Sequence, residues 1–246
     1  MVKHFYIFCK ISQCLTFSDS HCTDLITAAH CVDANINNQN PNHMVYVYTG
    51  SSSENFATNQ GHAFNTPTSQ VRVHPDWTAN VGEGHDIAIM TIPASQNPNW
   101  TQFVKLATQA EYEQLNRCDF FTVYGTGTTN TGEGVSDQLL KTADMQYLNC
   151  ETSDMSYFQH YSNHQHQGNY NLKPGFDHAL CMNSTVEFQP DGFSGICQGD
   201  SGGPLMHKDK LYGLVSYNYS ACRVKTVQGL KFGNFGHFQN IFRLLF

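Results

Sequence analysis

A single serine near the end of the chain lies in a glycine-rich stretch, where its hydroxyl could act as a nucleophile. Residues 197–204 read CQGDSGGP, so Ser201 follows Asp200 and is flanked by glycines. Glycines allow tight backbone turns that other residues resist. Such a turn can present the hydroxyl and aim backbone N–H groups at one point, the arrangement that stabilises an oxyanion. The stretch therefore predicts attack by a serine on a carbonyl group.

This chemistry needs a base and a carboxylate, because an isolated serine hydroxyl is a weak nucleophile. The chain offers both beside short apolar segments. His30 ends the stretch LITAAHC (residues 25–31), which predicts a strand running into a turn of small residues. Asp86 heads the apolar run IAIMTI, which predicts a strand over 86–92. Strand ends are therefore expected to position both side chains.

The remaining pattern is one of short strands joined by polar loops. Further strands are predicted at 44–48, 71–75, 120–124, 139–148, 204–207 and 211–217, the last two as a hairpin. Polar loops are expected at 35–42, 51–68 and 155–176, and the segment 93–117 is mixed. Apolar residues spaced by three, one and three predict a C-terminal helix: Phe238, Ile241, Phe242 and Leu245. Together these features predict an all-β class.

The composition excludes several other classes of protein. The 246 residues carry 13 Lys+Arg against 20 Asp+Glu, a formal net charge of −7, so no nucleic-acid partner is expected. No apolar run is long enough to span a membrane. The polar setting of His160, His164 and His166 favours a solvated loop over a metal site. The loop 51–68 has one acid, Glu54, so no calcium site is expected, and no cofactor is predicted.

Nine scattered cysteines indicate disulfides formed in an oxidising compartment. None forms a CxxC pair, so a zinc ribbon is not expected. The odd number leaves at least one cysteine without a partner in the chain. The first residues carry no secretory signal, because the apolar patch at 5–9 is too short. We interpret the protein as secreted, and residues 1–13 as a truncated or wrongly predicted start.

The segments around His30, Asp86 and Ser201, in this chain order, closely resemble those of the trypsin/chymotrypsin-like serine proteases. The motif GDSGGP is the most specific, and the likeness extends from about Cys14 to the end. The resemblance implies that Ser201 attacks the substrate carbonyl, His30 carries the proton, and Asp86 orients the imidazole. It also implies that the backbone N–H groups of Gly199 and Ser201 form the oxyanion hole.

The same resemblance implies a fold of two antiparallel six-stranded β-barrels with the site between them. The first barrel would cover residues 14–115 and carry the histidine and the aspartate, with one strand missing. The second barrel would cover residues 116–235 and carry the serine. The C-terminal helix would follow at residues 236–246.

The resemblance also locates the pocket for the substrate residue that precedes the cleaved bond. Its floor, six residues before the nucleophile, is Gly195, which brings no charge to recognise lysine or arginine. Asn218 stands where open pockets have glycine and would narrow the mouth. Cleavage after an uncharged residue is therefore expected. The walls implied by the spacing are Ser216, Tyr217, Asn218 and Gly229.

Three disulfides and one activating ion pair are implied by the family pattern. The disulfides are Cys14–Cys31, Cys150–Cys181 and Cys197–Cys222, which leaves Cys9, Cys22 and Cys118 unassigned. In the family, a newly released N-terminal ammonium, usually of an IVGG sequence, pairs with the acid before the nucleophile, here Asp200. No IVGG occurs in this chain. A buried carboxylate without a partner is costly, so the oxyanion loop would rearrange.

Three hypotheses about function follow. The first is a secreted, monomeric serine endopeptidase that acts on peptide or protein substrates and meets protein inhibitors. The second is an inactive or zymogen-like homologue that acts as a binding module, because the activating terminus is missing. The third is an incomplete chain that does not fold alone, since a barrel that lacks strands exposes unpaired edges.

Overall fold

The computed structural model describes the chain as a series of blocks. These blocks are residues 6–7, 24–37, 44–49, 62–67, 70–81, 84–92, 104–116, 119–128, 140–148, 179–184, 196–197, 199–218 and 239–244. They contain mostly strands, as the sequence predicted for an all-β class. Within these blocks, no helix is long and apolar enough to cross a membrane.

The first half of the chain contains two three-stranded sheets and one helix. Its elements are β1 (Tyr6–Ile7), β2 (Asp24–Thr27), α1 (Ala29–Asn37), β3 (Met44–Thr49), β4 (His62–Pro67), β5 (Val71–Val73) and β6 (Ala88–Thr91). One sheet has the order β1-β3-β4 and the other the order β2-β6-β5. Alternate residues of β6, Ala88 and Met90, are buried. They share one core cluster with Leu25 of β2 and Val32 of α1.

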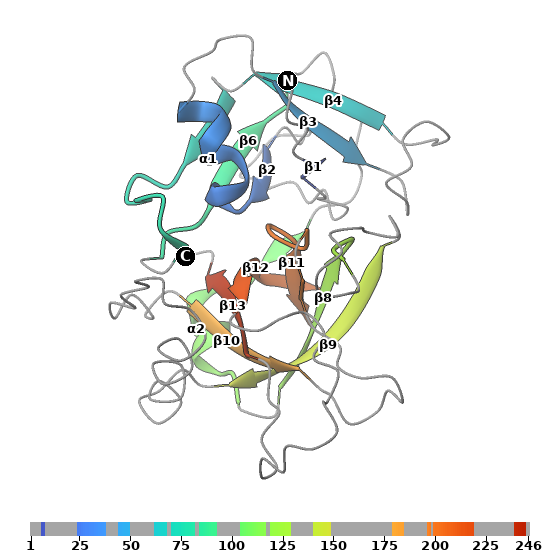
Figure 1. Cartoon of the computed structure of the whole chain (residues 1–246). Coiled ribbons are helices and arrows are strands. Elements are labelled where there is room, and N and C mark those ends of the chain that lie inside the picture. Colours follow the sequence, from blue (N-terminus) through green and yellow to red (C-terminus); the bar gives the residue numbers. More distant parts are fainter. Residues whose placement is uncertain are drawn as a thin grey trace, which may run out of the picture.

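The second half contains one large sheet and a short helix. Its elements are β7 (Lys105–Leu106), α2 (Gln109–Glu113), β8 (Phe120–Gly125), β9 (Lys141–Leu148), β10 (Ala179–Ser184), β11 (Pro204–His207), β12 (Lys210–Asn218) and β13 (Gln239–Leu244). The strand order is β11-β8-β9-β10-β13-β12-β7, and β11 also pairs with β12. Six strands therefore form a closed ring of pairings, with β7 outside it against β12. Figure 1 shows this group beside the one formed by α1 and β1 to β6.

One core cluster draws residues from five of the six strands of this ring. Phe121, Met145, Met182 and Leu205 belong to it, from β8, β9, β10 and β11, and each is almost completely buried. The ring of Phe121 meets the ring of Tyr212 from β12 edge to face, with centroids 5.2 Å apart. Aromatic pairs of this geometry add to the stabilisation that comes from burial.

Helix α2 is held in place at its first turn. The Thr108 hydroxyl accepts a hydrogen bond from the Glu111 N–H, and the Glu111 carboxylate accepts one from the Thr108 N–H, a capping box. Glu111 also forms an ion pair with Lys210 at the start of β12. This ammonium, followed by the Thr108 backbone, lowers the pKa of Glu111 to about 2. The stabilisation is therefore present above the ordinary pKa of 4.5 and is lost as the pH falls toward 2.

The expected C-terminal helix over residues 236–246 is wrong, because Gln239–Leu244 forms strand β13. This strand pairs antiparallel with β10 on one side and with β12 on the other. Hydrogen bonds along both sides of the strand outweigh the weak preference of so short a segment for a helix. The apolar spacing misled because a short apolar run fits either element.

The other strand predictions are confirmed, with shifts of a few residues at the ends. They are the strands expected at 44–48, 71–75, 86–92, 120–124 and 139–148, and the hairpin at 204–217. The loop predictions are less accurate. Helix α1 extends into the expected loop 35–42, and β4 lies inside the expected loop 51–68. The segment 93–117 contains β7 and α2, and the expected loop 155–176 lies outside the described residues.

Two adjacent phenylalanines in β8 provide a test of this core. Phe121 is 1% exposed and Phe120 is 57% exposed, because neighbouring residues of a strand point to opposite faces. We expect Phe121→Ala to lower the free energy of unfolding by about 3–5 kcal/mol, and Phe120→Ala by less than about 1 kcal/mol. Urea unfolding of both variants measures the difference, and equal effects would contradict the assignment of faces.

Candidate active site

His30 lies in the first turn of α1, directly after strand β2. Ala28 and Ala29 at this junction are completely buried, so only small side chains fit where the strand becomes a helix. The Cys31 N–H donates to the Ala28 C=O (3.2 Å). The sequence predicted the strand and a turn but missed the helix, which has no acidic residue in its first turn and ends in an Asn-rich stretch.

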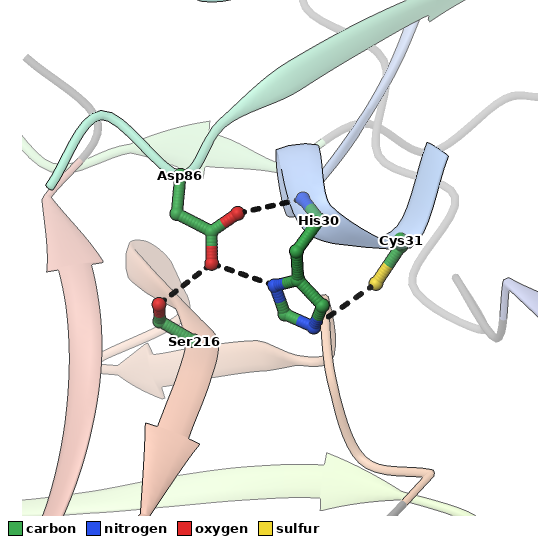
Figure 2. A network of polar contacts seen from close by, with 4 residues as sticks. All are labelled: His30, Cys31, Asp86 and Ser216. Atoms are coloured by element: carbon green, nitrogen blue, oxygen red, sulfur yellow. Dashed lines mark hydrogen bonds and ion pairs between the residues drawn. The ribbon is translucent and has the colours of Figure 1, made fainter. Parts of the chain in front are cut away.

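Asp86 is fully buried in the segment before β6 and accepts three hydrogen bonds. Its Oδ1 accepts from the His30 N–H (2.8 Å), and its Oδ2 accepts from His30 Nδ1 (2.7 Å) and from the Ser216 hydroxyl (2.6 Å). Figure 2 shows these groups converging on the carboxylate. An ionised carboxylate only accepts, so Nδ1 carries the proton and the neutral imidazole has its lone pair on Nε2.

Ser216 connects the second half of the chain to this carboxylate. It is buried near the end of β12, after the buried run 211–215. The sequence predicted it as a pocket wall and missed its hydrogen bond to Asp86. The available signal was a serine that ends an apolar strand, because a buried hydroxyl needs a partner. Its role in the pocket stays a prediction.

Figure 2 shows that the second ring nitrogen of His30 faces a thiol. Its Nε2 lies 3.7 Å from Cys31 Sγ. Burial lowers the pKa of His30, but the hydrogen bond to Asp86 and the contact with Cys31 outweigh burial and raise it to about 10. Cys31 is a free thiol, so the structure lacks the expected Cys14–Cys31 disulfide. The sulfur atom instead contacts the imidazole, and Cys14 lies outside the described residues.

Ser201 lies in a tight turn that leads into β11. Gly199 and Gly202 have φ values of 98° and 75°, a backbone conformation that favours glycine. The Asp200 N–H donates to the Cys197 C=O (3.1 Å) and closes the turn on one side. The prediction that the glycines of this stretch form a tight turn is confirmed.

The Ser201 turn packs against the segment that carries His30. A Cβ atom placed on Gly202 would lie 2.3 Å from Thr27 Oγ1 and 3.5 Å from Cys31 Sγ, which are close neighbours of His30 in sequence. The turn that carries Ser201 and the segment that carries His30 are therefore neighbours in the structure. Among the described residues, no hydrogen bond joins Ser201 to His30, since the contact of Nε2 is with Cys31.

The Asp200 carboxylate fixes the turn from its other side. It accepts hydrogen bonds from the N–H groups of Gly127 and Cys197, both 2.7 Å long. A Cβ atom on Gly125 would lie 1.9 Å from Asp200 Oδ1, and one on Gly127 would lie 2.6 Å from the same atom. Only glycines therefore leave room for this carboxylate. The sequence singled out Asp200 as an ion-pair partner but missed these two amides.

The N–H groups of Gly199 and Ser201 lie on this same turn. Within the described part of the chain, neither N–H donates to a protein acceptor. A backbone donor that is left unused and held by a rigid turn is what an oxyanion requires.

Several predicted site residues lie outside the described residues, and for others only the backbone is described. Gly195 and Gly229 are outside it, and Tyr217 and Asn218 are placed only as backbone of β12. Cys197 is disulfide-bonded. The other predicted disulfide residues give no test, because Cys150 and Cys222 lie outside the description and Cys181 is placed only as backbone of β10.

The contact between the glycines and Asp200 generates a prediction. We expect Gly127→Ala to displace the Asp200 carboxylate and lower the free energy of unfolding by about 1.5–3 kcal/mol, the value of a hydrogen bond to a charged group. Thermal unfolding measures the change. Thr142→Ala, at an exposed position of β9, is the matched control and should change stability by less than about 0.5 kcal/mol. An unchanged midpoint in Gly127→Ala would contradict this packing.

Known proteins resemble this chain over most of its length. A family model described as "Trypsin" matches residues 20–231. Trypsin zeta of Drosophila melanogaster is 29% identical over 210 residues, which cover 85% of this chain and 65% of that protein. Chymotrypsin-like elastase family member 1 of Rattus norvegicus is 26% identical over 193 residues, 74% of this chain and 58% of that protein. This chain thus spans less than two thirds of the length of these relatives.

A bacterial relative gives a similar result. The trypsin-like protease of Streptomyces glaucescens is 28% identical over 204 residues, 81% of this chain and 63% of that protein. The family match includes the segments that hold His30, Asp86 and Ser201. Membership of this family implies the chymotrypsin-like double β-barrel. This chain therefore belongs to the trypsin family of serine proteases.

Proposed function

We propose that this chain is a secreted serine endopeptidase that cleaves peptide bonds through an acyl-enzyme. The observation that carries the proposal is the buried Asp86 carboxylate, which binds both the N–H and the Nδ1 of His30 beside the Ser201 turn. This arrangement fixes the tautomer in which Nε2 can accept a proton. A fixed base beside a serine on a glycine turn is the requirement for nucleophilic catalysis.

The proposed reaction uses these groups in two steps. Ser201 Oγ attacks the carbonyl carbon while its proton passes to His30 Nε2, and Asp86 stabilises the resulting imidazolium. The oxyanion accepts hydrogen bonds from the N–H groups of Gly199 and Ser201. The imidazolium then gives its proton to the leaving amine, and an acyl-enzyme remains. Water attacks the acyl group by the same route and releases the acid and the free serine.

The substrate and the compartment follow from other residues. Gly195 at the pocket floor supports a preference for an uncharged residue before the cleaved bond, and Asn218 supports a narrow pocket mouth. The disulfide of Cys197 supports folding in an oxidising compartment, and hence secretion. The closed ring of β8 to β13 supports the second of two barrels, and β13 at Gln239–Leu244 extends this barrel beyond the expected bounds of residues 116–235.

A second candidate function is a zymogen-like or inactive homologue that acts as a binding module. One observation favours it: His30 Nε2 contacts Cys31 Sγ and not the Ser201 hydroxyl. A base that is engaged by a thiol does not activate a serine. The two candidates differ in whether Ser201 reacts.

A fluorophosphonate probe distinguishes the two, because it bonds covalently only to an activated serine. We expect the folded chain to be labelled, Ser201→Ala to lose labelling completely, and Ser184→Ala at the end of β10 to retain it. The labelled preparation should also cleave a peptide library after uncharged residues. A folded chain without labelling would refute the proposal and support the binding module, and cleavage after lysine or arginine would refute the proposed pocket.

The raised pKa of His30 predicts an unusual pH dependence. Only the neutral imidazole accepts a proton, so the labelling rate should rise with pH toward about 10. Cys31→Ala removes one cause of the raised pKa and should move this rise to lower pH. Stability follows the opposite course: the contribution of His30 is fully present below its ordinary pKa of 6.5 and is lost as the pH rises through about 10. If the labelling rate rose at the same pH in the native and the Cys31→Ala proteins, the role of the thiol would be contradicted.

A further inference from the structure

A second cluster of titratable side chains lies in the segment between β5 and β6. His74 and Asp76 follow β5, and His85 immediately precedes Asp86. Each of the three offers one potential metal-ligand atom, and these atoms lie within 4.8 Å of one another. None of these three side chains takes part in the proposed catalytic reaction. No short sequence motif marks this cluster, because His85 follows Asp76 by nine residues and His74 by eleven.

The backbone holds the two histidines side by side. The His74 N–H donates to the Ile87 C=O (2.9 Å), which ties the end of β5 to the residues before β6. The Ile87 N–H donates to the His85 C=O (2.8 Å), a tight turn with a φ of 56° at His85. A left-handed conformation at a residue other than glycine is uncommon and is found at functional sites.

A second turn brings the side chain of Asp76 close to the two histidines. The Trp77 N–H donates to the His74 C=O (3.0 Å), and the Asp76 N–H donates to His74 Nδ1 (3.2 Å). Asp76 Oδ2 lies 3.9 Å from that same Nδ1. The side chain of Asp76 is 70% exposed and that of His74 is 36% exposed, so an ion in solution can reach this cluster.

We propose that His74, Asp76 and His85 bind one divalent transition-metal ion of the zinc class. Two imidazoles and one carboxylate, with further positions open to water, suit Zn²⁺ or Co²⁺ and not calcium, which prefers oxygen ligands. The two imidazole rings now stack with centroids 4.6 Å apart. Ligand atoms about 2.1 Å from a tetrahedral zinc ion lie about 3.4 Å from one another. The three candidate atoms lie within 4.8 Å of one another, so the side chains must move closer and the stacked rings must turn toward the ion.

The position of the cluster connects it to the catalytic carboxylate. His85 and Asp86 are adjacent, with the first side chain half-buried at the cluster and the second fully buried at His30. A metal that rotates the His85 ring acts on a short turn that also sets the direction of Asp86. We therefore expect bound metal to weaken the support of His30 and slow the reaction of Ser201. This inhibition rests on the proposed function, whereas the metal site does not.

The binding test uses Ser201→Ala protein, so that its result does not depend on catalysis. Zn²⁺ is added to the metal-free full chain in a calorimeter, and the visible absorption of Co²⁺ reports imidazole ligands. We expect one ion per chain, without competition from Ca²⁺. Asp76→Asn and His74→Gln, at positions with solvent access, should each weaken binding by about tenfold or more. Cooperative thermal unfolding without metal verifies that both variants fold.

Two controls test whether another carboxylate or other histidines bind the ion, since the chain has 13 histidines. Asp209→Asn changes a matched exposed carboxylate in the turn between β11 and β12 and should leave the affinity unchanged. Joint replacement of His160, His164 and His166 by glutamine should also leave it unchanged. Full affinity in both Asp76→Asn and His74→Gln, or loss of affinity in the triple variant, would overturn the site.

The inhibition test measures the labelling rate of the native Ser201 protein with the fluorophosphonate probe. Zn²⁺ should slow labelling, EDTA should restore the rate, and Asp76→Asn should make labelling insensitive to Zn²⁺. Equal rates with and without bound Zn²⁺ would overturn the coupling. Absence of labelling in metal-free protein would instead refute the proposed function, while calorimetry on Ser201→Ala would still decide the metal site.

Discussion

The hydrogen bonds accepted by Asp86 are the interaction on which the rest of the site depends. They join His30, 56 residues earlier in the chain, and Ser216, 130 residues later. A fully buried carboxylate needs such donors, because an unpaired charge in the interior is strongly destabilising. The first-half sheets and the closed ring of the second half therefore cannot move apart without exposing or stranding this charge. The same bonds that orient the imidazole also fix the two halves to each other.

A second carboxylate performs a comparable task by accepting hydrogen bonds from backbone amides. Asp200 accepts from the amides of Gly127 and Cys197 and holds the turn in which Ser201 lies. Each carboxylate thus accepts at least one hydrogen bond from a distant segment of the chain, and for Asp200 this donor is the Gly127 N–H. Because these long-range contacts join segments far apart in the sequence, the geometry of the site depends on the fold, and a change at Gly125 or Gly127 acts on the Ser201 turn through Asp200.

The sequence predicted the parts of the structure that have local signals. GDSGGP marked the Ser201 turn by its glycines, and the apolar run after Asp86 marked β6. It failed where tertiary pairing decides, as in β13, which is a strand because β10 and β12 lie on either side of it. The contact of His30 with Cys31 was also missed, because family spacing assigned that cysteine to a disulfide. Side-chain partners across 56 or 130 residues leave no local pattern in a sequence.

The place of β13 in the ring has a consequence for synthesis on the ribosome. Strands β10 and β12 pair with β13 and not with each other, so the ring stays open until residues 239–244 have emerged. Until then β12, which carries Ser216, lacks one neighbour. Domains fold as units while the chain grows from its N-terminus. The first-half sheets can therefore form before β13 closes the ring of the second half. Because Ser216 of β12 donates to Asp86, the surroundings of this carboxylate are completed only after residues 239–244 have left the ribosome.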